Sequence, residues 1–326
     1  MLTRRLLLRA SAAAIATPAF HNLALAQSDW PSKPVKVIVP YPPAGGADTV
    51  SRILFTKLGE LWGKSFVIDN RGGAGGTIGE AAAAKSDPDG YTVLYDATAF
   101  SVNPALYPRL SFDYARDFQP VFLASLVPNI LVVTPSEPVS TAADVIKLAK
   151  ETPGGLNFAS SGNGTLQHLC LELFARRVGA KINHIPYRGG GLALNDVVAG
   201  QVKYFFSNGS SSVGLIQGAK VKAIAHTGKG RLGSLPDLPA LQETLSGFEA
   251  YEWNGVFVPT GTPAAIIAKL NAGLNEVLRQ PDIVARFKQL NVDFRENRPD
   301  EFRAFVAEET AKWGKVVQEA GIKLGS

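Results

Sequence analysis

The sequence predicts an α/β fold of two lobes, in which each lobe is a mostly parallel sheet flanked by helices. Apolar strand-like runs alternate with helical patterns along most of the chain, as they do in βαβ units. Two stretches also share one arrangement of strand, small-residue loop and helix: Val35–Val39 runs into YPPAGGADT, and Leu156–Ala159 runs into SSGNGT. Each loop leaves backbone N–H groups free at a helix N-terminus, where the helix dipole favours negative charge. We therefore expect a cleft that holds an anion from both sides.

The expected elements follow from the period of the apolar residues. Strand-like runs lie at Val35–Val39, Phe66–Asp69, Thr92–Tyr95, Val121–Leu126, Ile130–Thr134, Leu156–Ala159, Lys203–Phe206, Ala223–Ala225 and Val256–Val258. Helical patterns lie at Asp48–Trp62, Gly76–Lys85, Thr141–Glu151, Leu166–Val178 and Gly190–Ala199. The last third is mostly helical: one helix is capped by Thr262 with Pro263 at its first position, and a final helix starts at Pro299 and ends near Gly321.

The N-terminal segment has the pattern of a signal peptide. Basic residues Arg4 and Arg5 precede a small and apolar run, and Ala24-Leu25-Ala26 forms the A-x-A pattern that signal peptidase cuts. We therefore expect residues 1–26 to be removed and the mature protein to be a soluble protein of the periplasm. The basic start is compatible with both Sec and twin-arginine export.

Composition excludes two classes of protein. Cys170 is the only cysteine, so a disulfide framework is impossible and the fold depends on its core. The predicted signal peptide carries three arginines and no acid, so its removal lowers the net charge from +5 to +2. The remaining Lys and Arg residues are scattered, whereas a nucleic-acid binder would show a basic stripe, and no nucleic-acid partner is expected.

Two segments are candidate crossings between the lobes, Ser125–Asn129 and Gly247–Trp253. Two crossings make the first domain discontinuous, an arrangement that allows two lobes to hinge over a ligand. We expect domain 1 to contain residues 27–126 and 248–326, and domain 2 to contain residues 127–247.

Motifs for other chemistry are incomplete. NRGGAGGTIG fails the G-x-G-x-x-G pattern at Ile78, and GELWGKS lacks one residue of P-loop spacing. Four scattered histidines and one cysteine do not form a zinc site, and the G-x-S-x-G pattern of a serine nucleophile is absent from the sequence. We therefore expect no cofactor, no metal and no catalytic residue.

Several segments together resemble one known family. These are WPSKPVKVIVPYPPAGGADTVSR, NRGGAGGTIG, PDGYTVL, NPALYP, LNFASSGNGT, HIPYRGG, VPTGTP and KWGKVV. In order and spacing they are similar to the substrate-binding proteins of tripartite tricarboxylate transporters, the Bug family, over essentially the whole mature chain. The resemblance implies a monomeric, type II-like periplasmic binding protein that closes on a small carboxylate and delivers it to the permease subunits of a membrane transporter.

The resemblance also implies the ligand-binding residues. From the first loop it carries over Tyr41, Pro43, Ala44, Gly45, Gly46 and Asp48, and from the second loop Ser161, Gly162, Asn163, Gly164 and Thr165. Further candidates are Thr98, His168, Tyr187, Ser207 and Asn208. The chain departs from the family at Ala44, where glycine is frequent, at Ala47, where threonine is frequent, and at Ser207, where aspartate is frequent. Because Ser207 cannot supply the negative charge that would suit a ligand amino group, a plain organic acid is favoured over an amino acid.

Each of these features also has a structural explanation. The glycines of the first loop allow a tight turn, Asp48 can serve as a helix cap, and His168 can serve in the core. Arg188, the nearby cation, either pairs with a second carboxylate of the ligand or lies on the surface. Two alternative functions stay open: an exported esterase-like enzyme with Ser161 as nucleophile, and a solute sensor that feeds a membrane signalling partner.

Overall fold

The computed structural model describes residues 30–322, so the predicted signal peptide and its cleavage site lie outside the described residues. The strands are β1 (Val35–Val39), β2 (Phe66–Asn70), β3 (Thr92–Ala97), β4 (Phe118–Val133), β5 (Leu156–Ser160), β6 (Ile182–Pro186), β7 (Tyr204–Asn208), β8 (Lys222–His226) and β9 (Tyr251–Pro259). They form a nine-stranded sheet in the order β2-β1-β3-β9-β4-β7-β5-β6, with β8 paired to β4. The predicted α/β fold is confirmed.

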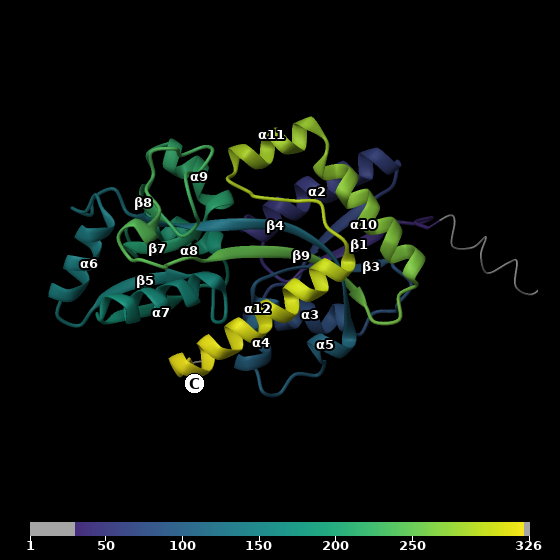
Figure 1. Ribbon diagram of the computed structural model, residues 1–326, viewed down its shortest axis with the longest axis horizontal. Coiled ribbons are helices and arrows are strands. Elements are labelled where there is room, and N and C mark those ends of the chain that lie inside the picture. Colours follow the sequence, from purple (N-terminus) through teal and green to yellow (C-terminus); the bar gives the residue numbers. More distant parts are fainter. Residues whose placement is uncertain (1–29, 323–326) are drawn as a thin grey trace, which may run out of the picture.

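Helices cover both faces of the sheet (Figure 1). They are α2 (Gly46–Trp62), α3 (Thr77–Ala84), α4 (Ala99–Leu106), α5 (Tyr114–Asp117), α6 (Ala142–Glu151), α7 (Leu166–Val178), α8 (Gly190–Val198), α9 (Gly209–Gln217), α10 (Ala264–Leu278), α11 (Pro281–Gln289) and α12 (Pro299–Ala320), with 3₁₀ turns η1 (Ala74–Gly76) and η2 (Leu241–Glu243). Within residues 30–322 no helix combines the length and apolar character needed to cross a membrane.

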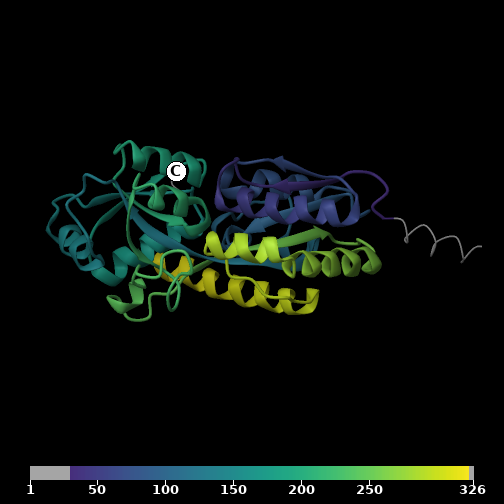
Figure 2. The ribbon, with the colours of Figure 1, turned by 90° about the horizontal axis from the view of Figure 1, so that it is seen from above.

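The sheet has two halves, which lie end to end along the long axis of the molecule (Figure 2). Parallel pairing, as predicted, joins β1 to β2 and β3 in the first half, and β5 to β6 and β7 in the second. The pairings of β4 and β9 are antiparallel, so the sheet is mixed. We call the half built on β1–β3 the first lobe and the half built on β5–β8 the second lobe.

Strand β4 runs through both lobes. Its residues 118–128 pair with β9, and its residues 129–133 pair with β7, so the change of partner falls between Pro128 and Asn129. The sequence predicts two separate strands here, Val121–Leu126 and Ile130–Thr134. In the structure the register shifts beside Pro120, and such bulges are where a sheet accommodates proline.

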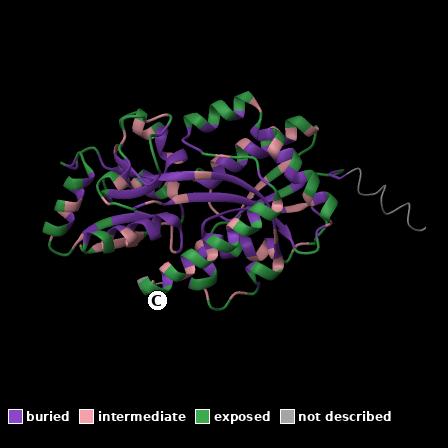
Figure 3. Cartoon of the chain, in the orientation of Figure 1, coloured by how far each residue is buried: buried purple, intermediate pink, exposed green. Residues whose placement is uncertain are grey.

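Helix α12 crosses from one lobe to the other (Figure 1). Near its start, Phe302 packs edge-on against Trp253 of β9 at 5.9 Å between ring centroids. Near its end, Trp313 and Val317 belong to the hydrophobic cluster that contains Phe158 of β5. Figure 3 shows buried residues concentrated along the strands, while the outer faces of the helices are exposed. One helix therefore contributes to the cores of both lobes.

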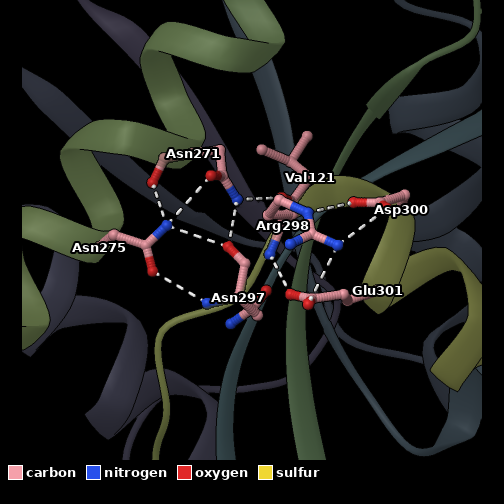
Figure 4. Close-up of polar contacts among 7 residues, drawn as sticks. All are labelled: Val121, Asn271, Asn275, Asn297, Arg298, Asp300 and Glu301. Atoms are coloured by element: carbon pink, nitrogen blue, oxygen red, sulfur yellow. Dashed lines mark hydrogen bonds and ion pairs between the residues drawn. The ribbon is translucent and has the colours of Figure 1, made fainter.

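The segment before α12 is held against the first lobe by asparagine side chains (Figure 4). The Asn297 side chain accepts a hydrogen bond from the Leu123 N–H at 2.9 Å and donates one to the Leu123 carbonyl at 2.9 Å, as the backbone of a neighbouring strand would. Asn271 Nδ2 donates to the carbonyls of Val121 at 2.8 Å and Asn297 at 3.0 Å. At the start of the helix, the Arg298 N–H donates to Glu301 at 2.8 Å. The bonds from Asn271 and Asn297 to Val121 and Leu123 satisfy backbone groups of β4 that no neighbouring strand pairs.

Candidate anion-binding site

A small cavity lies between the two lobes, where the predicted loops face each other. We call it the interlobe cavity, and its volume is about 40 Å³, room for a few water molecules or a small polar head group. It is lined by Tyr41, Pro42, Gly45, Gly46, Ala47, Ala97, Thr98, Ala99, Ser161, Thr165, Leu166, Gln167, Gly189, Gly190, Asn208, Ser211 and Glu252. Both lobes contribute to this wall.

The N-terminal ends of five helices meet at the interlobe cavity. Among the lining residues are the first residues or caps of α2, α4, α7, α8 and α9. Two of these helices, α2 and α8, begin after Gly45 and Gly189, which offer no side-chain cap to the first-turn N–H groups. Partial positive charge from the helix dipoles therefore gathers here, and it favours an anion. Of the described residues that line the cavity, none is Lys, Arg or His.

Asp48 holds the first loop in shape. Its carboxylate accepts hydrogen bonds from the Ala44 N–H at 3.1 Å, from Asn70 at 2.9 Å and from Arg52 at 3.0 Å. Burial acts to raise the pKa of the Asp48 carboxyl, but the hydrogen bonds from Arg52, Asn70 and Ala44 together hold it below its ordinary value. Ala44 has a φ of 67°, in the left-handed region that favours glycine. The departure from glycine at position 44 therefore leaves a strained residue in the loop.

A buried carboxyl pair supports this loop from behind. Tyr41 Oη donates to Asp96 at 2.8 Å, and Tyr114 Oη donates to Glu80. Both carboxyl groups belong to buried residues. Burial raises the pKa of Asp96 to about 6, and burial together with the nearby Asp96 raises the pKa of Glu80. Tyr41 thus connects the wall of the cavity to a group that titrates near neutral pH.

The second loop is built from two left-handed glycines and a histidine. Gly162 and Gly164 have φ values of 130° and 79°. The Gly164 N–H donates to Nδ1 of His168 at 3.2 Å, which requires an unprotonated Nδ1. Thr165 caps α7 and donates from Oγ1 to the Gly162 carbonyl at 2.7 Å. His168 therefore positions the loop from the first turn of its own helix.

Glu252 is the one charged side chain among the described residues that line the cavity. It stands in β9 opposite Val127 and is 8% exposed. Gln167, in the first turn of α7, donates from Nε2 to its carboxylate. Burial raises the pKa of the Glu252 carboxyl, against the Asn208 and Gln167 amides, which favour its ionised form.

The structure brings together part of the predicted site. The predicted residues that line the cavity are Tyr41, Gly45, Gly46, Thr98, Ser161, Thr165 and Asn208. The predicted residues that do not line it are Pro43, Ala44, Asp48, Gly162, Asn163, Gly164, His168, Tyr187 and Ser207. Several of these act behind the wall: Tyr187 Oη donates to Asp196 at 2.7 Å, and Ser207 is buried within β7. Arg188 is exposed and is not part of the cavity wall.

Sequence reasoning missed several lining residues, some of which come from helices that it did not predict. Ala97 and Ala99 flank the start of α4, and Ser211 lies in α9. Gly189 was missed although it directly precedes the predicted helix Gly190–Ala199, which is the observed α8. Glu252 was missed because a single acid in a strand carries no motif. A run of three glycines at the start of an amphipathic helix, as in YRGGG, was the signal that could have identified the α8 terminus as a third anion cradle.

Comparison with known proteins gives one consistent family. Residues 50–322 match the family model described as tripartite tricarboxylate transporter family receptor. Protein BugT of Bordetella pertussis is 35% identical over 298 residues, which are 90% of this chain and 91% of BugT.

Two solved structures share the fold and hold carboxylates. A protein of R. palustris solved with adipate has a TM-score of 0.88 and 33% identity, and the match covers 91% of this chain and all of that one, 100%. MatC of Rhodopseudomonas palustris with bound malate has a TM-score of 0.81 and 31% identity, over 88% of this chain and 100% of that one.

Proposed function

The chain belongs to the tripartite tricarboxylate transporter receptor family, and we propose that it binds a small organic acid in the interlobe cavity. The observation that carries this proposal is the meeting of five helix N-termini at a cavity with no basic side chain in its described wall. Adipate and malate bound to the two related structures support the same ligand class.

Backbone groups supply most of the affinity in this proposal. A dissociation constant near one micromolar corresponds to about −8 kcal/mol. Hydrogen bonds to a charged group contribute about 1.5–3 kcal/mol each, so several N–H donors at these helix ends are sufficient. The Thr98 hydroxyl accepts a bond from the Trp253 N–H at 3.0 Å, which leaves its own hydrogen for a ligand oxygen.

The ligand joins the lobes in this proposal. Domain 1 comprises residues 27–126 and 248–326, domain 2 comprises residues 127–247, and the two rotate about the segments near residues 126 and 247. Gly46 and Gly189 support such closure, because each lies in close contact with a side chain of the opposite lobe. A carboxylate that touches both lobes stabilises the closed state over the open one.

We further propose that the mature protein works in the periplasm and delivers its acid to the permease subunits of a tripartite transporter. The N-terminal export pattern and the family support this assignment. The family is one of receptors, and we propose that this chain has no catalytic role. Ser161 supports that view, because no hydrogen bond joins its hydroxyl to a histidine or carboxylate within residues 30–322.

A thermal-shift screen of organic acids, followed by calorimetric titration, tests the proposal. Binding to the folded state alone raises the melting temperature, by an amount that grows with ligand concentration. We expect at least one acid among dicarboxylates, tricarboxylates, aromatic acids and amino acids to do so. No shift with any of them, or hydrolysis of a model ester that Ser161→Ala abolishes, would overturn the proposal.

A further inference from the structure

The interlobe cavity contains a charge of the wrong sign for a site that attracts anions. Glu252 is 8% exposed and stands in the wall among the helix N-termini. The neighbouring strand residue across the sheet is Val127, so β4 offers no partner for the charge at this position. The carboxylate is therefore a candidate group for contact with a ligand.

The polar groups around Glu252 leave its charge uncompensated. Gln167 Nε2 donates one hydrogen bond to the carboxylate, and the same amide reaches Asn129 Oδ1 at 3.5 Å. Within residues 30–322 no Lys, Arg or His forms an ion pair with Glu252. An amide dipole solvates a carboxylate but does not neutralise it.

Asn208 adds a second unused group at the same wall. Its Oδ1 accepts from the Ser210 N–H at 2.9 Å and from the Ser210 hydroxyl at 2.6 Å, which fixes the orientation of the amide. Its Nδ2 is buried beside Glu252 and favours the ionised form of that carboxyl, but no described residue accepts a hydrogen bond from it with good geometry. A buried amide donor without a partner is a group that a ligand oxygen can satisfy.

We propose that the bound acid carries a protonated amine, which pairs with Glu252 while its carboxylate lies on the helix N-termini. This inference rests on the proposed function, since it concerns the ligand of the same cavity. While Glu252 is ionised, a plain acid would place a second negative charge beside it in a site of about 40 Å³, and a carboxyl pair in a buried site is stable only if one member takes up a proton. An ammonium group removes that repulsion and supplies three hydrogen-bond donors.

A hydroxyl group fits the site less well than an ammonium group. A hydroxy acid can donate one hydrogen bond to Glu252, but both negative charges remain in the cavity. A protonated amine on the ligand would reverse the preference drawn from Ser207. That residue lies within β7 and its hydroxyl is directed to the Asn208 carbonyl at 3.4 Å, so the acid missing at position 207 is provided from β9.

Calorimetric titration with matched pairs of acids tests this inference. The pairs are aspartate and succinate, glutamate and glutarate, alanine and propionate, and phenylalanine and 3-phenylpropionate, which differ only by the amine. We expect the preferred pair to favour the amino acid at least about tenfold. In Glu252→Gln, which keeps an oxygen to accept from Gln167, amino-acid affinity should fall about a hundredfold, as loss of one partner of a buried ion pair implies.

The control is Glu296→Gln, which changes the net charge equally at an exposed ion pair with Arg279. It should bind the same acids as the unmodified protein, and circular dichroism should show all three proteins folded. Equal or tighter binding of the plain acids, or unchanged amino-acid affinity in Glu252→Gln, would overturn the inference while leaving the receptor function intact. Failure of every acid in both classes would instead overturn the proposed function.

Discussion

Gly46 of the first lobe lies directly against Asn208 of the second. A Cβ placed on Gly46 would come within 2.5 Å of Asn208 Cγ, far closer than carbon atoms tolerate. Asn208 cannot easily rotate away, because its Oδ1 is bonded to Ser210 at the start of α9. The absence of a side chain at position 46 is therefore what permits the described approach of the two lobes.

Gly46→Ala should weaken acid binding by at least about tenfold without unfolding the protein, because the added methyl holds the lobes apart. Titration calorimetry measures the affinity and thermal melting measures the stability. The matched control is Gly214→Ala in α9, where an added Cβ meets no atom within 4 Å. Equal affinity in the two variants would show that closure does not depend on this contact.

His168 positions the second loop through its Nδ1. His168→Phe leaves the buried Gly164 N–H without its acceptor, at a cost of about 1–3 kcal/mol in the free energy of unfolding. His168→Asn places an oxygen near the site of Nδ1 and should recover most of that loss. Urea denaturation compares the three proteins. A phenylalanine variant as stable as the unmodified chain would contradict the assigned role.

Asp96 makes the stability of the folded protein depend on pH, and the direction of that dependence follows from its raised pKa. Its pKa of about 6 in the folded protein exceeds the value of about 3.9 expected for an unfolded chain. The folded state therefore binds more protons between these values, and this residue lowers stability as pH rises from about 4 to about 6, by about 3 kcal/mol in total.

Asp96→Asn removes that titration while keeping an oxygen for the Tyr41 hydroxyl. At each pH, the free energy of unfolding of the variant is compared with that of the unmodified protein. This difference should favour the variant more at pH 7.5 than at pH 4. Chemical denaturation at the two pH values measures the difference. The same stability change at both values would show that Asp96 does not titrate in this range.

Arg188 is exposed and stands outside the cavity wall, so it should not contribute to binding. Arg188→Gln is expected to retain the affinity of the unmodified protein for every acid that binds, within about a factor of two, the scale of a surface charge effect. Titration calorimetry at one fixed ionic strength decides this. A tenfold loss would mean that a basic side chain joins the backbone donors.

The first and second loops were predictable from sequence, whereas the full set of helix N-termini at the interlobe cavity was not. The loops at Gly45 and Gly164 were recognised because small residues precede amphipathic helices. Helix α9 has the sequence GSSSVGLIQ, whose glycines and serines have low helix propensity, and α4 contains Pro104. Tertiary packing stabilises both helices, and their termini complete the cavity.

The role of Glu252 was also beyond sequence reasoning. It depends on the pairing of β9 with β4 and on α7, a helix about 85 residues earlier, which carries Gln167. A pattern of neighbouring residues cannot report such a meeting. By contrast, the departure at Ala44 was visible in the sequence, and the left-handed backbone there explains why glycine is favoured at that position.

The central claim is that the interlobe cavity binds a carboxylate on helix N-termini. Titration calorimetry tests it most directly. It compares aspartate, malate and adipate each with the diamide in which both carboxylates are replaced. We predict saturable binding of at least one acid and a loss of about a hundredfold or more for its amide, since the negative charge is what the helix dipoles select. Equal binding of acid and amide would contradict the claim.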